Sequence, residues 1–283
     1  MNAVWPHPVV GPTLGAMPEL PEVETIRRAI EPHIVGTQIA DITLLDPSIA
    51  GPDGPEHLRT AIGSPVRAVL RRGKHLILVL ERNRGLVLHL RMTGALLLEE
   101  PPAQARIRAV LSFSNGEKLL FNDMRRLGTM RFYEDLKPLL LRIGPEPFDE
   151  DFNADRLKES LSRHHIPIKA ALLDQHIVAG IGNMYADEAL FQVGVHPLTP
   201  ANELTYEQVA RLWQAIRDVL DRAIARQGAS IDTYWLPNGE RGTAHDAFNV
   251  AHKKGAACPK CSTPIERIMV RKRGAYFCPT CQN

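Results

Sequence analysis

Cysteine, long apolar runs and net charge are all scarce in this sequence. Only four of the 283 residues are cysteine, and none of them precedes Cys258. The longest apolar runs, such as residues 76–80 and 86–90, are far shorter than the roughly 20 residues that a membrane-spanning helix needs. We therefore expect no membrane span and no disulfide scaffold before Cys258. Because the formal net charge is only +2, any attraction to nucleic acid must depend on where the charges lie.

A recognisable targeting signal is also missing. Residues 1–16 have no basic segment, and Pro6, Pro8 and Pro12 interrupt their apolar stretch, which is not typical of a secretory signal. We expect a cytoplasmic location by default. With 44% hydrophobic and 23% charged residues, the composition is that of an ordinary soluble globular protein, and the length suits about two domains and a small module.

Hydrophobic periodicity divides the chain into a β-rich half and a helical half. Residues 21–34 have apolar positions at helical spacing, which predicts an amphipathic helix. The next part of the chain, to about residue 133, predicts short strands, and the Asn115-Gly116 pair is typical of a tight hairpin turn. The strands are expected at residues 39–44, 66–70, 76–80, 86–90, 109–113 and 118–121.

Residues 143–153 are rich in proline, glycine and acids, which indicates a linker into the helical half. No clear period is present from residue 228 to 251, and we expect a mobile loop there. The helices are predicted at residues 155–162, 168–173, 184–191 and 206–226.

The cysteines occur as two pairs, Cys258-x2-Cys261 and Cys278-x2-Cys281, with the spacing of a four-thiolate zinc site. Two disulfides are the alternative. A zinc ion with four protein thiolates has no open position for water, so one structural zinc is expected rather than a catalytic one. From Lys253 to the C-terminus, seven basic residues stand against one acid, which suits contact with phosphates.

Two further motifs accompany the cysteines, namely MPELPEVE at residues 17–24 and IGNMYA at residues 181–186. Over residues 17–283 the sequence resembles the formamidopyrimidine-DNA glycosylase family. The resemblance implies an α+β multidomain fold with an N-terminal helix and eight-stranded β-sandwich, a helix-two-turn-helix α domain and a C-terminal four-cysteine zinc-finger β-hairpin. The expected boundaries are 1–16 for a non-native or unstructured extension, 17–142 for the catalytic domain, 143–153 for the linker, 154–252 for the helical domain with its lesion loop, and 253–283 for the finger.

The same resemblance implies a base-excision-repair enzyme. It would be a DNA glycosylase with AP lyase activity that removes oxidised purines (8-oxoguanine and formamidopyrimidines) from duplex DNA by β,δ-elimination. Pro18 would be the Schiff-base nucleophile and Glu19 the proton donor. Lys74 would donate the proton for elimination, and Arg273 would assist δ-elimination and contact phosphate. A secondary amine suits this chemistry, because its adduct with the sugar is cationic without protonation.

The resemblance also implies an interface with double-stranded DNA that contains oxidised bases or abasic sites. Met92, Arg125 and Leu127 would fill the space left by the extruded base, with Leu127 replacing the family's usual aromatic residue. There are alternative interpretations of three of these residues. Met92 and Leu127 could be core residues, and Lys74 could be a solvated charge in a turn. We expect a monomer located with the nucleoid. The remaining expected DNA contacts are Arg106, Arg108, Lys169, Asn183 and Arg273.

Pro18 can act as a nucleophile only if its nitrogen is a free amine, because an acylated proline nitrogen is not nucleophilic. We therefore expect translation to start at Met17 and Met17 to be removed. Two other functions remain open: an endonuclease VIII-like glycosylase for oxidised pyrimidines, and a non-catalytic protein that binds damaged DNA. Leu20 favours the purine branch, since the pyrimidine branch typically has glycine there. A ribosomal or tRNA-associated helix-two-turn-helix protein would not require the proline.

Overall fold

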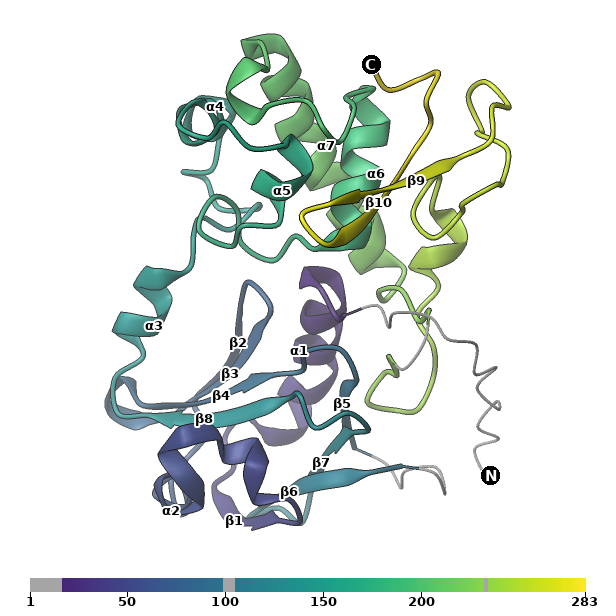
Figure 1. The fold of residues 1–283 in the computed structure, drawn as a ribbon. Helices are drawn as coiled ribbons and strands as arrows, with labels where there is room; N and C mark the ends of the chain where they lie inside the picture. The colour runs from purple at the N-terminus through teal and green to yellow at the C-terminus, as the bar shows by residue number, and fades with distance from the viewer. Residues whose placement is uncertain (1–16, 99–104, 232–233) are drawn as a thin grey trace. The chain divides into compact units, whose positions relative to one another are not determined.

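A computed structural model describes residues 17–98, 105–231 and 234–283, which form two compact units (Figure 1). Among these described residues, unit 1 comprises those up to Leu141 together with those in Arg226–His245, and unit 2 comprises Arg142–Ala225 and Asp246–Asn283. The expected extension at residues 1–16 lies outside the described residues, as do residues 232–233 of the expected loop. Within the described part of the chain, no helix combines the length and apolar character that crossing a membrane requires.

Helix α1 (Leu20–Ile34) confirms the first predicted helix. Its apolar positions recur on one face and are fully buried. Each such aliphatic side chain contributes roughly 1.5–3 kcal/mol to stability relative to an exposed one. The helix begins with proline in its first turn, where the missing N–H has no intrahelical partner in any case, and it is followed by Gly36 at φ +84°. The buried aliphatic residues are Leu20, Val23, Ile26, Ile30 and Ile34.

Within the described residues of unit 1, eight strands form two four-stranded antiparallel sheets, which confirms the expected β-sandwich. One sheet has the order β1 (Ile39–Leu44), β6 (Ile107–Phe113), β7 (Lys118–Asp123), β5 (Gly94–Leu97). The other has the order β2 (Ala68–Arg72), β3 (His75–Val79), β4 (Gly85–His89), β8 (Thr129–Tyr133). Buried residues of α1 and of both sheets belong to one hydrophobic core.

The predicted hairpin between β6 and β7 is confirmed. The Phe113 N–H donates to the Glu117 carbonyl at 2.9 Å, and Gly116 adopts φ +89°, which glycine allows without steric cost. Sequence periodicity did not identify β5 or β8. In β5 all four residues are buried, so the strand lacks the polar alternation that marks a half-exposed strand.

Short helical segments lie between the strands and at the end of the sandwich. Leu136, directly before the last of them, packs with Leu139 and Leu140 against Ile77 and Val87 in a second apolar cluster. The segments are η1 (Pro47–Asp53), α2 (Gly54–Arg59), η2 (Glu81–Asn83) and α3 (Lys137–Arg142).

The segment Arg226–His245 belongs to unit 1, although the sequence predicted it as part of the helical domain. The physical reason is burial of apolar side chains. Tyr234 and Leu236 are part of the sandwich core, and the Leu98 N–H at the end of β5 donates to the Pro237 carbonyl at 2.9 Å. Unit 1 is therefore built from two separate stretches of chain.

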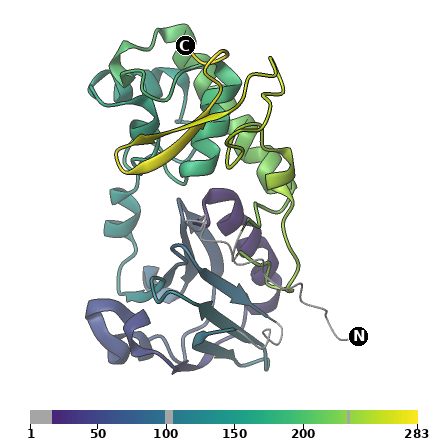
Figure 2. The same ribbon diagram turned by 45° about the vertical axis from the view of Figure 1, so that its right-hand side comes forward.

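Unit 2 contains the four helices that the sequence predicts, followed by a β-hairpin (Figure 2). Residues 143–153, expected to be a linker, contain no helix or strand. The last helix is the longest and strongly amphipathic, and η4 (Ala244–Ala247) lies at the boundary between the units. The elements are α4 (Ala154–Ser162), α5 (Ile168–Leu172), α6 (Asn183–Val193), η3 (Ala201–Glu203), α7 (Tyr206–Ala225), β9 (Glu266–Val270) and β10 (Arg273–Phe277).

Candidate active site and nucleic-acid interface

Pro18 and Glu19 lie at the start of α1, and both are buried. Glu19 is the N-cap residue and has extended backbone angles, so the chain turns directly from Glu19 into the helix. Its backbone N–H donates to the Glu22 carboxylate at 2.8 Å. This bond satisfies one of the N–H groups that every helix leaves unpaired at its first turn, and it fixes the direction in which Pro18 enters the helix.

Glu22 was not among the predicted site residues, although it is completely buried. Its other carboxylate oxygen accepts the backbone N–H of Ala229 at 2.7 Å. A Cβ at Gly228 would lie 2.9 Å from the Glu22 side chain, so only glycine allows this close approach. Glu22 therefore connects the start of α1 to the returning segment. The glutamate three residues after an N-cap position was the available sequence signal.

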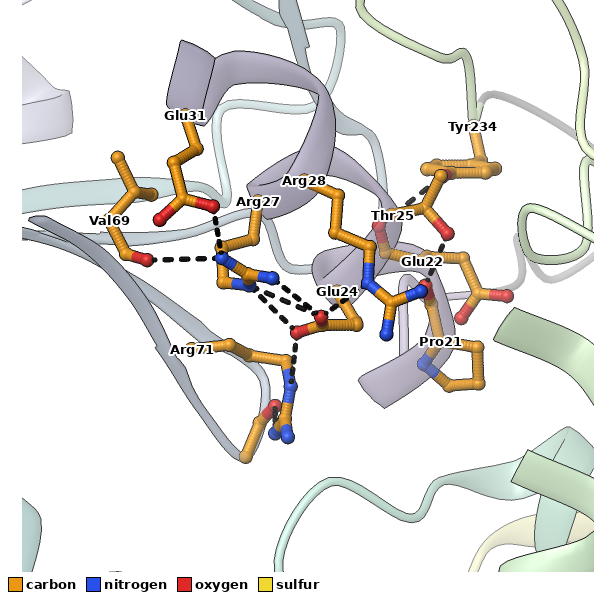
Figure 3. A network of polar contacts seen from close by, with 11 residues as sticks. Pro21, Glu22, Glu24, Thr25, Arg27, Arg28, Glu31, Val69, Arg71 and Tyr234 are labelled. Atoms are coloured by element: carbon orange, nitrogen blue, oxygen red, sulfur yellow. Dashed lines mark hydrogen bonds and ion pairs between the residues drawn. The ribbon is translucent and has the colours of Figure 1, made fainter. Parts of the chain in front are cut away.

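Glu24 joins α1 to β2 of the β2–β3 hairpin (Figure 3). Lys74 lies in the turn of this hairpin. Glu24 pairs with Arg27 at 3.0 Å and Arg28 at 2.7 Å on its own helix, and with Arg71 of β2 at 3.4 Å. Burial raises the pKa of Glu24, but hydrogen bonds from Arg27 and Arg28 outweigh that effect, and the net pKa lies below its ordinary value. Lys74 itself is 7% exposed, so it is more deeply buried than a solvated turn lysine would be.

His75 and His89 form a pair of histidines next to Lys74, and neither was among the predicted site residues. They are directly opposite each other on β3 and β4, and their rings meet edge to face with centroids 4.7 Å apart. Burial lowers the pKa of both, and for His89 the neighbouring His75, Arg91 and Lys74 help to bring it to about 2. The Arg91 N–H donates to His89 Nδ1 at 3.1 Å, so the neutral ring carries its proton on Nε2.

Met92, Arg125 and Leu127 lie on two loops at one end of the sandwich, between β4 and β5 and between β7 and β8. Met92 is half-buried, whereas Arg125 and Leu127 are exposed, Leu127 to 41%. The Arg125 guanidinium donates to Met92 Sδ at 3.6 Å, so the two loops meet. At this exposure Leu127 is not a core residue, which was the alternative interpretation of its position. The prediction that these side chains enter DNA stays a prediction.

Arg106 and Arg108 differ in their surroundings. Arg106 is exposed, and its backbone N–H donates to the Asn122 amide oxygen at 2.7 Å. The side chain of Arg108 is only 13% exposed, because its Nε donates to the Asp123 carbonyl at 2.7 Å and it pairs with Asp46 at 3.5 Å. Arg108 thus holds β6 against the turn after β7, and its expected phosphate contact is untested.

In unit 2, Lys169 is fully buried rather than presented to solvent. Its ammonium group donates to the Asp187 carboxylate at 2.5 Å and to the Asn183 carbonyl at 2.5 Å. Burial raises the pKa of Asp187 to about 6, while Lys169 acts in the opposite direction. Lys169 therefore anchors the first turn of α6, and its predicted DNA contact stays untested. Asn183 Oδ1 is buried without a hydrogen-bond partner among the described residues, so it can accept a hydrogen bond from a ligand. With the side-chain amide flipped, the same position would carry the NH₂ group and donate to a ligand.

The four cysteines form one cluster, with all four sulfur atoms within 4.8 Å of one another. The Cys258–Cys281 and Cys261–Cys278 sulfur distances are 3.9 and 3.4 Å. Tetrahedral zinc with bonds of about 2.3 Å to sulfur requires sulfur atoms about 3.8 Å apart, so the cluster fits zinc. Disulfides are excluded here, because bonded sulfur atoms lie about 2.05 Å apart and all four cysteines are free. The cluster is a structural zinc site.

The β9–β10 hairpin extends from this site and is tied to α6. Phe191 of α6 packs against Cys258 and Cys278, and the Lys260 ammonium group donates to the Phe191 carbonyl at 3.1 Å. Arg271 and Lys272 form the turn with left-handed angles, φ +44° and +65°. They and Arg273 are exposed, so the hairpin tip is a basic surface.

Comparison with known proteins identifies each part of the chain in order. Residues 17–130 match the formamidopyrimidine-DNA glycosylase N-terminal domain, residues 143–234 its H2TH domain, and residues 255–283 the zinc finger found in FPG and IleRS. The formamidopyrimidine-DNA glycosylase of Chloroflexus aurantiacus is 45% identical over 271 residues, which cover 94% of this chain and 98% of that protein.

Solved structures give the same result. A point mutant of Lactococcus lactis FPG in complex with Fapy-dG containing DNA has a TM-score of 0.86 at 36% identity, covering 94% of this chain and 100% of that one. MutM in complex with carbocyclic 8-oxo-G containing DNA has a TM-score of 0.85 at 36% identity with the same coverage. A β-sandwich followed by an H2TH domain and a four-thiolate finger defines a zinc-finger DNA glycosylase. The chain belongs to the formamidopyrimidine-DNA glycosylase family.

Proposed function

We propose that this protein is a bifunctional base-excision-repair enzyme, a DNA glycosylase for oxidised purines that is also an AP lyase. The observation that carries the proposal is the PELPE segment, which sets a proline and then a buried glutamate at the start of α1. Family membership supports glycosylase activity, and relatives crystallised with Fapy-dG and 8-oxo-G DNA support the purine class. The substrate is duplex DNA with an oxidised base or an abasic site, bound by a monomer in the nucleoid.

The Pro18 amine attacks C1′ of the damaged nucleotide, and the bond from C1′ to the base breaks as the base leaves with the electron pair and takes up a proton. Glu19 protonates the sugar ring oxygen and opens the ring, which leaves an iminium cation between Pro18 and the sugar. The iminium withdraws electrons, so water takes up the C2′ proton and the 3′ phosphate leaves with the electron pair of its bond. Loss of the C4′ proton to water then releases the 5′ phosphate in the same way. Lys74 and Arg273 are the proton donors for these eliminations, and hydrolysis of the iminium returns the free Pro18 amine.

The remaining residues bind DNA in this proposal. Asn183 and Arg273, both in unit 2, hold the phosphate of the extruded nucleotide, for which an amide N–H and a guanidinium are suited. Met92 and Leu127 occupy the space left by the base, and Arg125 faces the orphaned partner base. Arg106, Arg108 and Lys169 are proposed as supporting contacts. The domain limits 17–142, 143–153, 154–252 and 253–283 remain our proposal for the order of domains along the chain, although residues 226–245 within the third of them pack with unit 1.

Borohydride trapping tests the lyase chemistry. The protein whose N-terminus is Pro18, verified by mass spectrometry, should form a covalent adduct with abasic duplex DNA when borohydride reduces the iminium. A matched protein that retains residues before Pro18 has an acylated nitrogen and should form none. An adduct in the retained form would contradict the role of Pro18.

A panel of duplexes that each contain one lesion tests the substrate class. Faster excision of 8-oxoguanine and formamidopyrimidines than of oxidised pyrimidines is expected. The opposite order would support the endonuclease VIII-like alternative. Binding without any excision by the Pro18 form would support a non-catalytic protein.

A further inference from the structure

Asp123, the last residue of β7, is a buried carboxylate that no functional assignment above uses. It is 1% exposed, and among the described residues it makes no salt bridge with its side chain. Four hydrogen bonds replace a counter-ion. One carboxylate oxygen accepts the N–H groups of Leu127 at 2.8 Å and Gly128 at 2.7 Å. The other accepts the Arg125 N–H at 3.1 Å and the Thr93 hydroxyl.

These four donors come from two different loops. Arg125, Leu127 and Gly128 belong to the loop between β7 and β8, whereas Thr93 directly follows Met92 in the loop between β4 and β5. The Thr93 hydroxyl oxygen also accepts the Arg125 N–H at 3.1 Å, so that amide is shared between the two side chains. We call the Asp123 carboxylate and the Thr93 hydroxyl the Asp123 node. The node fixes the backbone on both sides of Arg125 and next to Met92.

The backbone around the node leaves little freedom for another arrangement. Arg91 and Arg126 have left-handed angles, φ +54° and +57°, which residues other than glycine adopt only when the surroundings impose them. A Cβ on Gly128 would lie 2.7 Å from the Phe121 ring, and one on Gly94 would lie 2.4 Å from the Leu90 carbonyl oxygen. Both loops are therefore packed tightly at their bases while Arg125 and Leu127 are exposed.

We propose that Asp123 and Thr93 are positioning residues that join the two loops into one wedge, already formed before DNA binds. This inference rests on the proposed function, in which Met92, Arg125 and Leu127 replace an extruded base. A preformed wedge does not lose backbone freedom when it enters the duplex, so less of the interaction energy is consumed in ordering it. Asp123 touches neither substrate nor reacting atoms and acts through the loops.

Asp123→Asn is the direct test. The amide keeps one oxygen as an acceptor but replaces the other with an NH₂ group. In one orientation this group would face the N–H groups of Leu127 and Gly128, and in the other it would face the Arg125 N–H and the Thr93 hydroxyl. Excision of a base-paired oxidised purine under single-turnover conditions should fall about tenfold or more, the size expected for a buried donor left without its partner. Cleavage at a preformed abasic site, where no base is extruded, should fall by less than about threefold.

Two further variants make the result interpretable. Thr93→Val keeps the shape of the side chain and removes only the hydroxyl, so it tests the node even if Asp123→Asn fails to fold. It should slow excision of a base-paired oxidised purine by less than Asp123→Asn does, and it should leave cleavage at an abasic site nearly unchanged. Asp41→Asn is the matched control, because Asp41 accepts the Thr43 hydroxyl at 2.6 Å on the exposed face of β1. It should change neither rate. Equal losses on both substrates in folded Thr93→Val would overturn the proposal.

Hydrogen exchange in the DNA-free protein provides a readout that needs no activity. The amides of Arg125, Leu127 and Gly128 should exchange slowly in the unaltered protein and about tenfold faster in Thr93→Val or Asp123→Asn. If these amides exchange at unprotected rates in the unaltered protein, the wedge is not preformed and the inference fails. If the unaltered Pro18 form cleaves no substrate but its amides are protected, the proposed function fails while the node remains.

Discussion

At the scale of single residues, the most informative comparison is between Glu19 and Glu22, two buried acids one turn apart on α1. The Glu22 carboxylate accepts the N–H groups of Glu19 and Ala229, so both of its oxygens hold backbone. Those bonds would be lost if Glu22 gave its lone pairs to a substrate. We assign the proposed proton transfer to Glu19 because it adjoins Pro18 in the chain, although its own side chain takes part in the capping box with Glu22.

Glu19→Gln should abolish base excision, with a loss of about a hundredfold or more, because an amide cannot donate the proton while it keeps the size of the acid. DNA affinity should stay within about twofold, since no positive charge is lost. Single-turnover excision and fluorescence anisotropy measure the two quantities. Glu31→Gln on the exposed side of α1 is the control and should excise normally. Unchanged excision by Glu19→Gln would remove Glu19 from the acid role.

At the scale of elements, α1 and the β2–β3 hairpin are held together by charge as well as by apolar packing. Glu24 receives hydrogen bonds from two arginines of its own helix and lies 3.4 Å from Arg71 of β2. Its folded-state pKa lies below its ordinary value, so the ionised form stabilises the folded protein. That stabilisation is fully present above the unfolded-state pKa and is lost as the pH falls through the lower folded-state pKa.

Glu24→Gln should lower the free energy of unfolding at pH 7 by about 2 kcal/mol, the typical contribution of hydrogen bonds to a buried charge. The difference between the variant and the unaltered protein should begin to shrink as the pH falls below about 4.3, the ordinary pKa of glutamate, and should continue to shrink until the carboxylate of the folded protein is protonated. Urea unfolding across this range measures both effects. The exposed pair of Glu56 and Arg59 gives a control, since Glu56→Gln should change little. A difference that does not vary with pH would contradict the electrostatic explanation.

How much the sequence could predict depended on whether the determining contacts were local. Helix α1, the Asn-Gly hairpin and the cysteine pairs follow from spacing within a few residues, and the structure confirms all three. Other features depend on contacts between distant residues. Glu22 meets a partner 207 residues away, and Lys169 is buried because Asp187 lies on another helix. Periodicity carries no information about such pairs, so the sequence did not predict the buried ion pair of Lys169, whose DNA contact was expected from the family resemblance alone.

At the scale of the whole molecule, the finger connects metal binding to DNA affinity. Cys278→Ser removes one of four zinc ligands, and thiolate coordination supplies much of the folding energy of such small modules. We expect zinc content to fall and the dissociation constant for DNA to rise about tenfold or more. Thr280→Ala, at an exposed position beside the same ligand pair, is the matched control and should retain zinc. Normal affinity in a zinc-free Cys278→Ser protein would contradict the link.

The salt dependence of binding measures how many phosphates the protein contacts. Replacing Arg273 with alanine should weaken binding to any duplex sequence and reduce the slope of log affinity against log salt by about 1. Arg59→Ala on α2 removes an equal charge from a surface with no proposed DNA contact, and it should leave the slope unchanged. A slope that is equally steep in Arg273→Ala would mean that Arg273 does not neutralise a phosphate.

The two-part construction of unit 1 also sets an order of events during synthesis. The ribosome makes Glu22 early, but Ala229, which closes over its carboxylate, emerges only after all four helices of unit 2. The start of α1 therefore lacks this contact for most of translation. The proposed role of Pro18 requires its nitrogen to be released, and that interval leaves the nitrogen open to enzymes that trim nascent chains. The late arrival of Arg226–His245 thus separates this proposed maturation step in time from the closing of the segment over Glu22.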